Sequence, residues 1–286
     1  MKTVGPTMIG KICIVTGGTS GIGKETALAL SRLGATTILV ARDAAKGAAV
    51  VNELRTLTGN PNVHFLAADL SSQAQIRALS EQFMQRYKRL DLLVNNAGVM
   101  LVKSSLSVDG IETTFAVNHL SYFLLTNLLL DVIQSSGPAR IVNVSSGLHT
   151  MATLDWNDLQ SAKNYSPLKA YNRSKLANLL FTYELARRLD GRAVTVNAAD
   201  PGFARTNLYS IRNLGLIPSV LTLLTLPFAH SAAGGAQTII QLATAPELAK
   251  VNGKYFENEK EALSSAASRD LKDAVRLWQI SADLTS

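Results

Sequence analysis

The sequence predicts a single-domain α/β protein, built as a doubly wound parallel sheet with helices on both faces. Short apolar runs rich in Val and Ile recur along the chain, and segments with a helical spacing of apolar residues separate them. A parallel strand that is buried on both faces has a continuous apolar sequence. A crossover connection, usually a helix, must join it to the next parallel strand. A glycine-rich turn directly after the first run is the third observation, and it is typical of such folds.

The elements are expected in strict alternation. The expected strands are 12–15, 37–40, 63–67, 92–94, 141–144 and 194–197. The expected helices are 24–33, 44–57, 73–87, 113–133, 174–189 and 232–243. Residues 253–256 read as a last short strand, and a charged helical tail follows through Trp278. No repeat or second domain boundary is visible, so residues 1–286 are expected to form one domain.

The composition indicates a globular protein and argues against several kinds of binding site. Of the 286 residues 47% are apolar and 17% are charged, which suits a globular core. The net charge is +7, but the basic residues are scattered and form no run longer than 88–89 or 187–188, so no nucleic-acid partner is expected. The single cysteine, Cys13, lies in an apolar run, and neither a disulfide framework nor a metal site is expected.

Membrane segments and targeting signals are not expected either. Residues 1–10 hold one lysine and no long apolar stretch, unlike a secretory signal, so a cytoplasmic protein is expected. Residues 214–228 are apolar but contain Pro218 and fall short of the roughly 20 residues that span a bilayer. Residues 203–230 leave the strand and helix alternation and are expected to form a lid over a substrate pocket. A core, a subunit contact or a peripheral membrane contact stays open for this leucine-rich segment.

The glycine-rich turn lies between the first strand and the first helix. Glycines allow a tight turn and a close approach of the backbone to a pyrophosphate at the positive end of the helix. The position of the turn makes it a strong signal for a dinucleotide. The turn residues expected to bind this cofactor are Gly17, Thr19, Ser20, Gly21, Ile22 and Gly23.

The end of the second strand distinguishes NADP(H) from NAD(H). An NAD(H) site usually has an acidic residue about 20 residues after the glycines, whereas an arginine suits the 2′-phosphate of NADP(H). Here Ala41 and then Arg42 follow the strand, so NADP(H) is favoured over NAD(H). Asp43 can pair with Arg42 or cap the next helix, and Lys24 is a further candidate phosphate contact.

The third and fourth strands also end in candidate cofactor residues. Open α/β sheets bind ligands at the carboxyl ends of their strands. Asp69 can accept a hydrogen bond from an adenine amino group, and Leu70 follows it. Asn96 precedes the small pair Ala97 and Gly98, which allows the backbone to approach the adenosine. The alternative for the asparagines at 95 and 96 is that they tie neighbouring strands together.

Tyr171 and Lys175 are the candidate acid/base pair. Residues four apart share one face of a helix, and a cation beside a tyrosine stabilises its phenolate form. Tyr165 and Lys169 have the same spacing, but Pro167 is expected in the first turn of the helix and leaves Tyr165 outside it. Such a pair by itself is common on surface helices.

Two further polar residues complete the candidate site. Ser146, at the carboxyl end of the strand 141–144, can hydrogen-bond a substrate oxygen, and Ser145 is the weaker candidate. Asn118 lies inside a long apolar helix, where a buried amide needs a partner and suggests a kink that holds water. A purely structural role for Asn118 stays open.

Together these motifs resemble the short-chain dehydrogenase/reductase family over nearly the whole chain. The resemblance implies a Rossmann fold in which Tyr171 is the acid/base, Ser146 positions the carbonyl, and Lys175 tunes Tyr171 and holds the nicotinamide ribose. It also implies an Asn118-supported proton relay, and pairing of copies through 113–133 and 174–189. The matching pieces are Thr16-Gly17 with Gly21-Ile22-Gly23, Asn95-Asn96-Ala97-Gly98, Asn118, Ser146, Tyr171 with Lys175, and, as implied nicotinamide contacts, Pro201, Gly202 and Thr206.

Within the family the sequence is most similar to the retinol dehydrogenase branch, at 21–28, 171–178 and 253–256. That branch usually prefers NADP(H), in agreement with Arg42. The pair Ala41-Arg42 differs from the Cys-Arg common there, and residues 1–10 lack the pattern of the membrane anchor that many animal members carry. Retinoid activity is therefore not implied by the resemblance alone.

The sequence thus predicts an NADP(H)-dependent oxidoreductase that moves a hydride between nicotinamide and an alcohol/carbonyl pair. We expect a carbonyl reductase for an apolar aldehyde or ketone of retinal-like or aromatic type. Two alternatives stay open: a double-bond reductase of the protochlorophyllide reductase type, and an NADP(H)-sensing protein without catalysis. The complete set of Ser146, Tyr171 and Lys175 argues against a sensor, which needs the nucleotide site alone.

Overall fold

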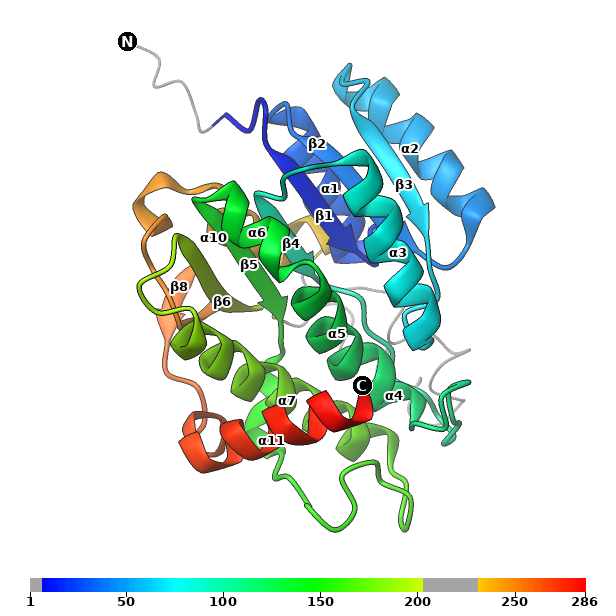
Figure 1. Ribbon diagram of the computed structural model, residues 1–286, viewed down its shortest axis with the longest axis vertical. Coiled ribbons are helices and arrows are strands. Elements are labelled where there is room, and N and C mark those ends of the chain that lie inside the picture. The colour runs from blue at the N-terminus through cyan, green and yellow to red at the C-terminus, as the bar shows by residue number, and fades with distance from the viewer. Residues whose placement is uncertain (1–6, 203–230) are drawn as a thin grey trace.

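The computed structural model describes residues 7–202 and 231–286 (Figure 1). Eight strands form one sheet in the order β3-β2-β1-β4-β5-β6-β7-β8, and all neighbours are parallel except β7 and β8. The predicted fold class is confirmed, because the strand order runs outward in both directions from the β1 and β4 pair. The strands are β1 (Ile12–Thr16), β2 (Thr36–Ala41), β3 (Val63–Ala67), β4 (Leu92–Asn95), β5 (Ala139–Val144), β6 (Val194–Asp200), β7 (Tyr255–Glu257) and β8 (Lys260–Ala262).

Helices cover both faces of the sheet (Figure 1). Successive residues of β1 point to opposite faces, so Ile14 packs with Phe83 of α3 in one core cluster, and Val15 packs with Val51 of α2 in the other. The first face carries α3, α5 and α7, and the second carries α1, α2 and α10. The helices are α1 (Gly21–Arg32), α2 (Ala44–Thr58), α3 (Gln73–Arg86), α4 (Thr113–Phe115), α5 (Ser121–Leu128), α6 (Leu130–Ser136), α7 (Pro167–Arg188), α10 (Ala232–Thr244) and α11 (Leu271–Leu284).

Three elements differ from the sequence prediction. The expected helix 113–133 is divided into α4, a π-helical turn over Ala116–Leu120, α5 and α6. Helix α7 begins at Pro167, as expected from a proline in its first turn, so it starts seven residues before the range 174–189 that the apolar spacing predicted. The last predicted strand pairs with β8, which the sequence did not reveal.

Some predictions fall outside what the structure describes. The expected lid over 203–230 and the expected nicotinamide contact Thr206 both lie outside the described residues. That residues 1–286 form one domain stays a prediction.

Helix α11 lies across α5 and α7 (Figure 1). The Trp278 ring has its centroid 5.0 Å from that of Phe123 on α5 and 5.8 Å from that of Phe181 on α7. The Arg188 guanidinium stacks 4.1 Å from the same indole. Helix α11 thus covers part of the surface of α5 and α7, the helices through which the family resemblance implied pairing of copies.

Gly47 of α2 provides a test of the packing between α2 and β3. A Cβ at this position would lie 2.4 Å from the Phe65 ring. Alanine is favoured over glycine inside a helix by about 1 kcal/mol, yet we expect Gly47→Ala to lower the melting temperature, because the ring has to move. Thermal unfolding measures this. In a Phe65→Leu background the penalty is expected to disappear, and a Gly47→Ala variant more stable than the wild type would contradict the packing.

Candidate active site

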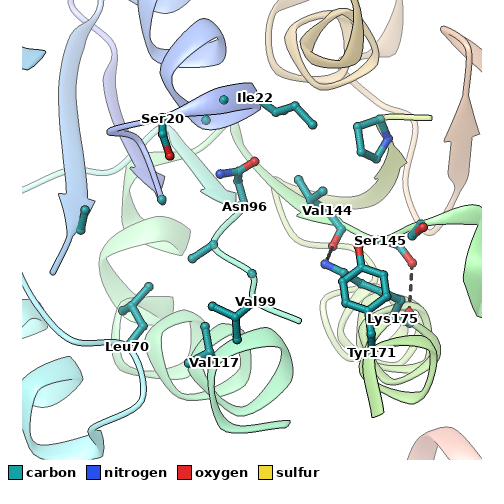
Figure 2. A pocket seen from close by; sticks show the side chains of 18 of the residues that line it. Ser20, Ile22, Leu70, Asn96, Val99, Val117, Val144, Ser145, Tyr171 and Lys175 are labelled. Carbon is teal, nitrogen blue, oxygen red and sulfur yellow. Dashed lines mark hydrogen bonds between the residues drawn. The ribbon is translucent and has the colours of Figure 1, made fainter. Parts of the chain in front are cut away.

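A cavity of about 400 Å³ lies at the carboxyl ends of β1 to β6, which is where open α/β sheets bind ligands (Figure 2). Thr19 is buried and Asn118 is fully buried, and neither lines the cavity. The predicted site residues that line it are Gly17, Ser20, Gly21, Ile22, Gly23, Arg42, Asp69, Leu70, Asn96, Ala97, Gly98, Ser146, Tyr171, Lys175, Pro201 and Gly202.

The glycine-rich turn packs directly against the end of β4. Gly17 has a φ of +67°, and a Cβ there would lie 2.9 Å from Asn96 Nδ2. A Cβ at Gly23 would lie 2.4 Å from the same atom and 2.5 Å from the Gly17 carbonyl oxygen. No side chain larger than hydrogen fits at Gly23, so the start of α1 is held close to the cavity with its positive end facing it.

Polar side chains tie the ends of β1, β4 and β5 together. Thr16 Oγ1 accepts hydrogen bonds from the backbone N–H groups of Asn96 (2.8 Å) and Ala97 (3.0 Å), while Asn96 Nδ2 donates to the Thr16 carbonyl (2.8 Å). Asn95 Nδ2 donates to Asn143 Oδ1 on β5 (2.9 Å). The two asparagines therefore do join strands, and sequence reasoning missed that Thr16 is the partner of Asn96 and Asn143 that of Asn95.

Arg42 lies at the outer end of the cavity with its side chain 80% exposed, and its Nη1 atom is 3.9 Å from Asp69 Oδ2. Asp43 caps α2 by accepting from the Lys46 N–H, which decides between its two predicted roles. Lys24 forms an ion pair with Glu53 (2.6 Å). Arg42 is thus the cation at this end of the cavity that can turn toward a phosphate.

The two serines after β5 have different surroundings. Ser145 is buried, and its hydroxyl donates to the Lys175 carbonyl oxygen at 3.0 Å. Ser146 Oγ accepts from the Leu148 N–H (3.3 Å) at the start of a 3₁₀ turn over Gly147–Met151. This bond uses a lone pair of Ser146 and leaves its O–H hydrogen for a substrate oxygen, so the geometry favours Ser146 over Ser145.

Lys175 and Tyr171 lie side by side on α7 beside the end of β5 (Figure 2). The lysine is 3% exposed, its Nζ donates to the Val144 carbonyl oxygen at 3.0 Å, and it lies 5.5 Å from the centroid of the Tyr171 ring. Burial lowers the pKa of Lys175 to about 8, and the Asp200 carboxylate opposes this shift. The side chain therefore changes charge close to neutral pH. Tyr165, the alternative tyrosine, lies outside α7 and donates to the Leu101 carbonyl oxygen.

Asn118 lies in the π-helical turn, where the regular α-helical hydrogen-bonding pattern is interrupted. Its Oδ1 accepts from the Val99 N–H (2.8 Å), and its Nδ2 donates to the Val99 carbonyl oxygen and to Ser174 Oγ (both 2.9 Å). The side-chain amide is thus occupied by protein partners, and its neighbour Val117 lines the cavity instead. The implied proton relay through Asn118 stays a prediction.

Comparison with known proteins identifies the family. The profile of the short chain dehydrogenase family matches residues 11–214. This chain belongs to the short chain dehydrogenase family. It is 45% identical to retinol dehydrogenase 12 of Mus musculus over 96% of this chain and 86% of that protein, so the predicted similarity to the retinol dehydrogenase branch is confirmed. The protein is therefore an oxidoreductase that acts on an alcohol/carbonyl pair with a nicotinamide cofactor.

Solved structures agree with this assignment. A crystal structure of a protein from Mycobacterium paratuberculosis superposes with a TM-score of 0.80 at 33% identity, and covers 99% of this short chain dehydrogenase and 96% of its own chain. The NADP complex of RhlG from Pseudomonas aeruginosa superposes with a TM-score of 0.70 at 30% identity, over 87% and 95% of the two chains.

In residues 7–202 and 231–286 the helices are short or mostly polar, and the potential metal ligands are dispersed. No single helix there is long and apolar enough to cross a membrane, although the bent pair Thr113–Leu128 and Leu130–Ser136 passes by length and composition. No group of three potential metal ligands occurs within these ranges. The cytoplasmic location stays a prediction.

The lowered pKa of the buried Lys175 can be tested through the pH dependence of the free energy of unfolding. Its folded pKa of about 8 lies below the ordinary 10.5, so between these values the unfolded chain binds a proton that the folded chain does not. The wild type should therefore gain stability relative to Lys175→Met by about 1.4 kcal/mol per pH unit as pH rises from 8 to 10. Urea unfolding of both proteins at several pH values measures the difference, and a pH-independent difference would contradict a buried ammonium.

Proposed function

We propose that this short chain dehydrogenase is an NADP(H)-dependent carbonyl reductase for apolar aldehydes or ketones. One observation carries the proposal: the Tyr171, Lys175 and Ser146 side chains line the same cavity as the glycine-rich turn. An acid/base pair beside a phosphate cradle suits hydride transfer coupled to proton transfer, and a nucleotide sensor needs no such pair.

The residues fit a dinucleotide along the whole cavity. Gly17 and Gly23 leave no room for a Cβ, which suits the close approach of a pyrophosphate, and Thr19, Ser20, Gly21 and Ile22 complete that turn. Ser20 precedes α1 without capping it by its side chain, so the first N–H groups of the helix can receive an anion. The residues that would hold the adenosine are Asp69, Leu70, Asn96, Ala97 and Gly98, and those that would contact the nicotinamide are Pro201, Gly202 and, beyond the described residues, Thr206.

When bound, the reduced nicotinamide supplies the hydride that a carbonyl carbon receives. Tyr171 donates the proton to the carbonyl oxygen, and the Lys175 ammonium stabilises the phenolate that remains. Ser146 holds the same oxygen through its free O–H hydrogen as negative charge develops there. The Val144 carbonyl fixes the position of Lys175 and leaves its other two N–H donors for the nicotinamide ribose.

Two observations support NADP(H) over NAD(H). Arg42 is exposed at the end of the cavity where the adenosine ribose would lie, and its contact with Asp69 is long. The structural relative RhlG, at 30% identity, was solved as a complex with NADP. A guanidinium in this position can bind a 2′-phosphate through two parallel hydrogen bonds.

An apolar substrate is supported by the surroundings of Tyr171. Met100 and Tyr171 form an apolar cluster, and the partly buried Leu148 packs against it. The sequence relatives are named for retinol. We therefore propose retinal-like or aromatic carbonyls as the substrate class, and association of the enzyme into a homo-oligomer remains part of the proposal.

Tyr171→Phe tests the catalytic assignment. Removal of the proton donor is expected to lower kcat with NADPH and an aromatic aldehyde by at least about 100-fold. NADPH binding, measured by fluorescence titration, should change little. Tyr165→Phe is the matched control and should keep most of the rate. Equal losses in the two variants, or an active Tyr171→Phe, would contradict the assignment.

Arg42→Leu tests the choice of cofactor. Loss of a charge-assisted contact at an exposed position is expected to raise KM for NADPH about tenfold. KM for NADH should stay near its wild-type value, because NADH has no 2′-phosphate. Steady-state kinetics with both cofactors measure the ratio, and an unchanged KM for NADPH would remove Arg42 from the phosphate site.

A further inference from the structure

Asp200, the last residue of β6, is a buried carboxylate beside the active site that the sequence did not single out. It is 4% exposed. Its Oδ1 accepts from the Gly202 N–H at 2.8 Å, and its Oδ2 accepts from the Tyr255 hydroxyl at 3.0 Å. Within residues 7–202 and 231–286 no lysine or arginine forms an ion pair with it. A buried anion of this kind is costly unless a nearby charge offsets it.

The carboxylate also lies against the turn that follows Ser146. A Cβ on Gly147 would be 3.1 Å from Asp200 Oδ2, so glycine is what allows this approach. Two residues further, His149 Nε2 accepts from the Ser265 N–H (3.1 Å), which places the ring hydrogen on Nδ1, where it is donated to the Ser146 carbonyl oxygen (2.7 Å). Burial lowers the pKa of His149, so this neighbour is neutral and contributes no positive charge near pH 7.

Asp200 ends β6 next to the end of β5, where Val144 pairs with Ala199 and the Val144 carbonyl oxygen holds Lys175 Nζ. The carboxylate raises the pKa of Lys175 against the effect of burial. The other ionisable groups around the two charges are Tyr171 on α7 and Tyr122 on α5, whose rings face the ammonium, His149 in the 3₁₀ turn, and Tyr255 and Glu257 on β7. Burial, and then the Asp200 charge, raise the pKa of Tyr255, which keeps it a hydrogen-bond donor.

We propose that Asp200 is a positioning residue of the active site: its fixed negative charge keeps the Lys175 ammonium protonated, and its hydrogen bond to Gly202 shapes the turn that faces the nicotinamide. Gly202 has a φ of +67°, and its N–H is taken up by Asp200. This inference rests on the proposed function, since it assigns Lys175 a role in proton transfer.

Asp200→Asn and Tyr255→Phe separate the charge from the hydrogen bonds. The asparagine keeps the shape and removes the charge, whereas Tyr255→Phe removes one hydrogen bond and keeps the charge. In the pH profile of kcat/KM for NADPH-dependent reduction, Asp200→Asn should move the alkaline limb about one pH unit lower, because Lys175 then loses its proton earlier. Tyr255→Phe should leave the limb in place. A limb unmoved in Asp200→Asn, or moved equally in both variants, would overturn the proposal.

A second measurement does not depend on turnover. At pH 7, Asp200→Asn should raise the unfolding equilibrium constant by a factor that depends on the background. This factor should be about ten times larger in the wild type than in the Lys175→Met variant, because only the wild type has the charge pair. At pH 10, where Lys175 is neutral, the two factors should be equal. Asp200→Ser replaces Asp200→Asn if the latter does not fold. Equal factors at pH 7 would overturn the proposal, whereas coupling without any turnover would leave it standing and refute the reductase function instead.

Discussion

The burial of the Lys175 ammonium between α7 and the end of β5 is the constraint on which the active site depends. An unpaired buried charge is costly, so the surrounding groups have to offset it. Val144 offers its carbonyl oxygen to Lys175 Nζ and to Asn178 Nδ2, while Ser145 donates to the Lys175 carbonyl. These bonds fix the position of α7 along β5. Tyr171, one turn before the lysine, is thereby placed at the cavity wall.

The opposite wall depends on a different kind of contact. Thr16 and Asn96 bind each other's backbone at the point where the strand order reverses, and this draws the ends of β1 and β4 together. The glycine-rich turn then fits against Asn96 because Gly17 and Gly23 have no Cβ. The glycine-rich turn and the pair Tyr171 and Lys175 thus line one cavity although they come from distant parts of the chain. That arrangement is what hydride transfer with proton transfer requires.

Much of this architecture can be predicted from sequence because its causes are local. Runs such as 12–15 and 141–144 are recognisable since parallel strands bury both faces, and the spacing of Tyr171 and Lys175 follows from the helical period. The sequence suggested a kink at Asn118 but not its π-helical form, and it did not reveal the short β8, since each depends on distant partners, Val99 for the first and β7 for the second. Asp200 was not singled out, because its local hydrogen bond to Gly202 resembles an ordinary turn and its second partner, Tyr255, is 55 positions away.

Transfer of deuterium tests the central claim, carbonyl reduction, most directly. NADPH carrying deuterium at both C4 positions of the nicotinamide would be incubated with retinal, an aldehyde conjugated to several double bonds, and the product examined by NMR and mass spectrometry. The account predicts one deuterium on the carbinol carbon of the alcohol product and none along the polyene chain. Deuterium at a former double-bond carbon, or tight NADPH binding with no transfer to retinal or to aromatic aldehydes, would contradict it.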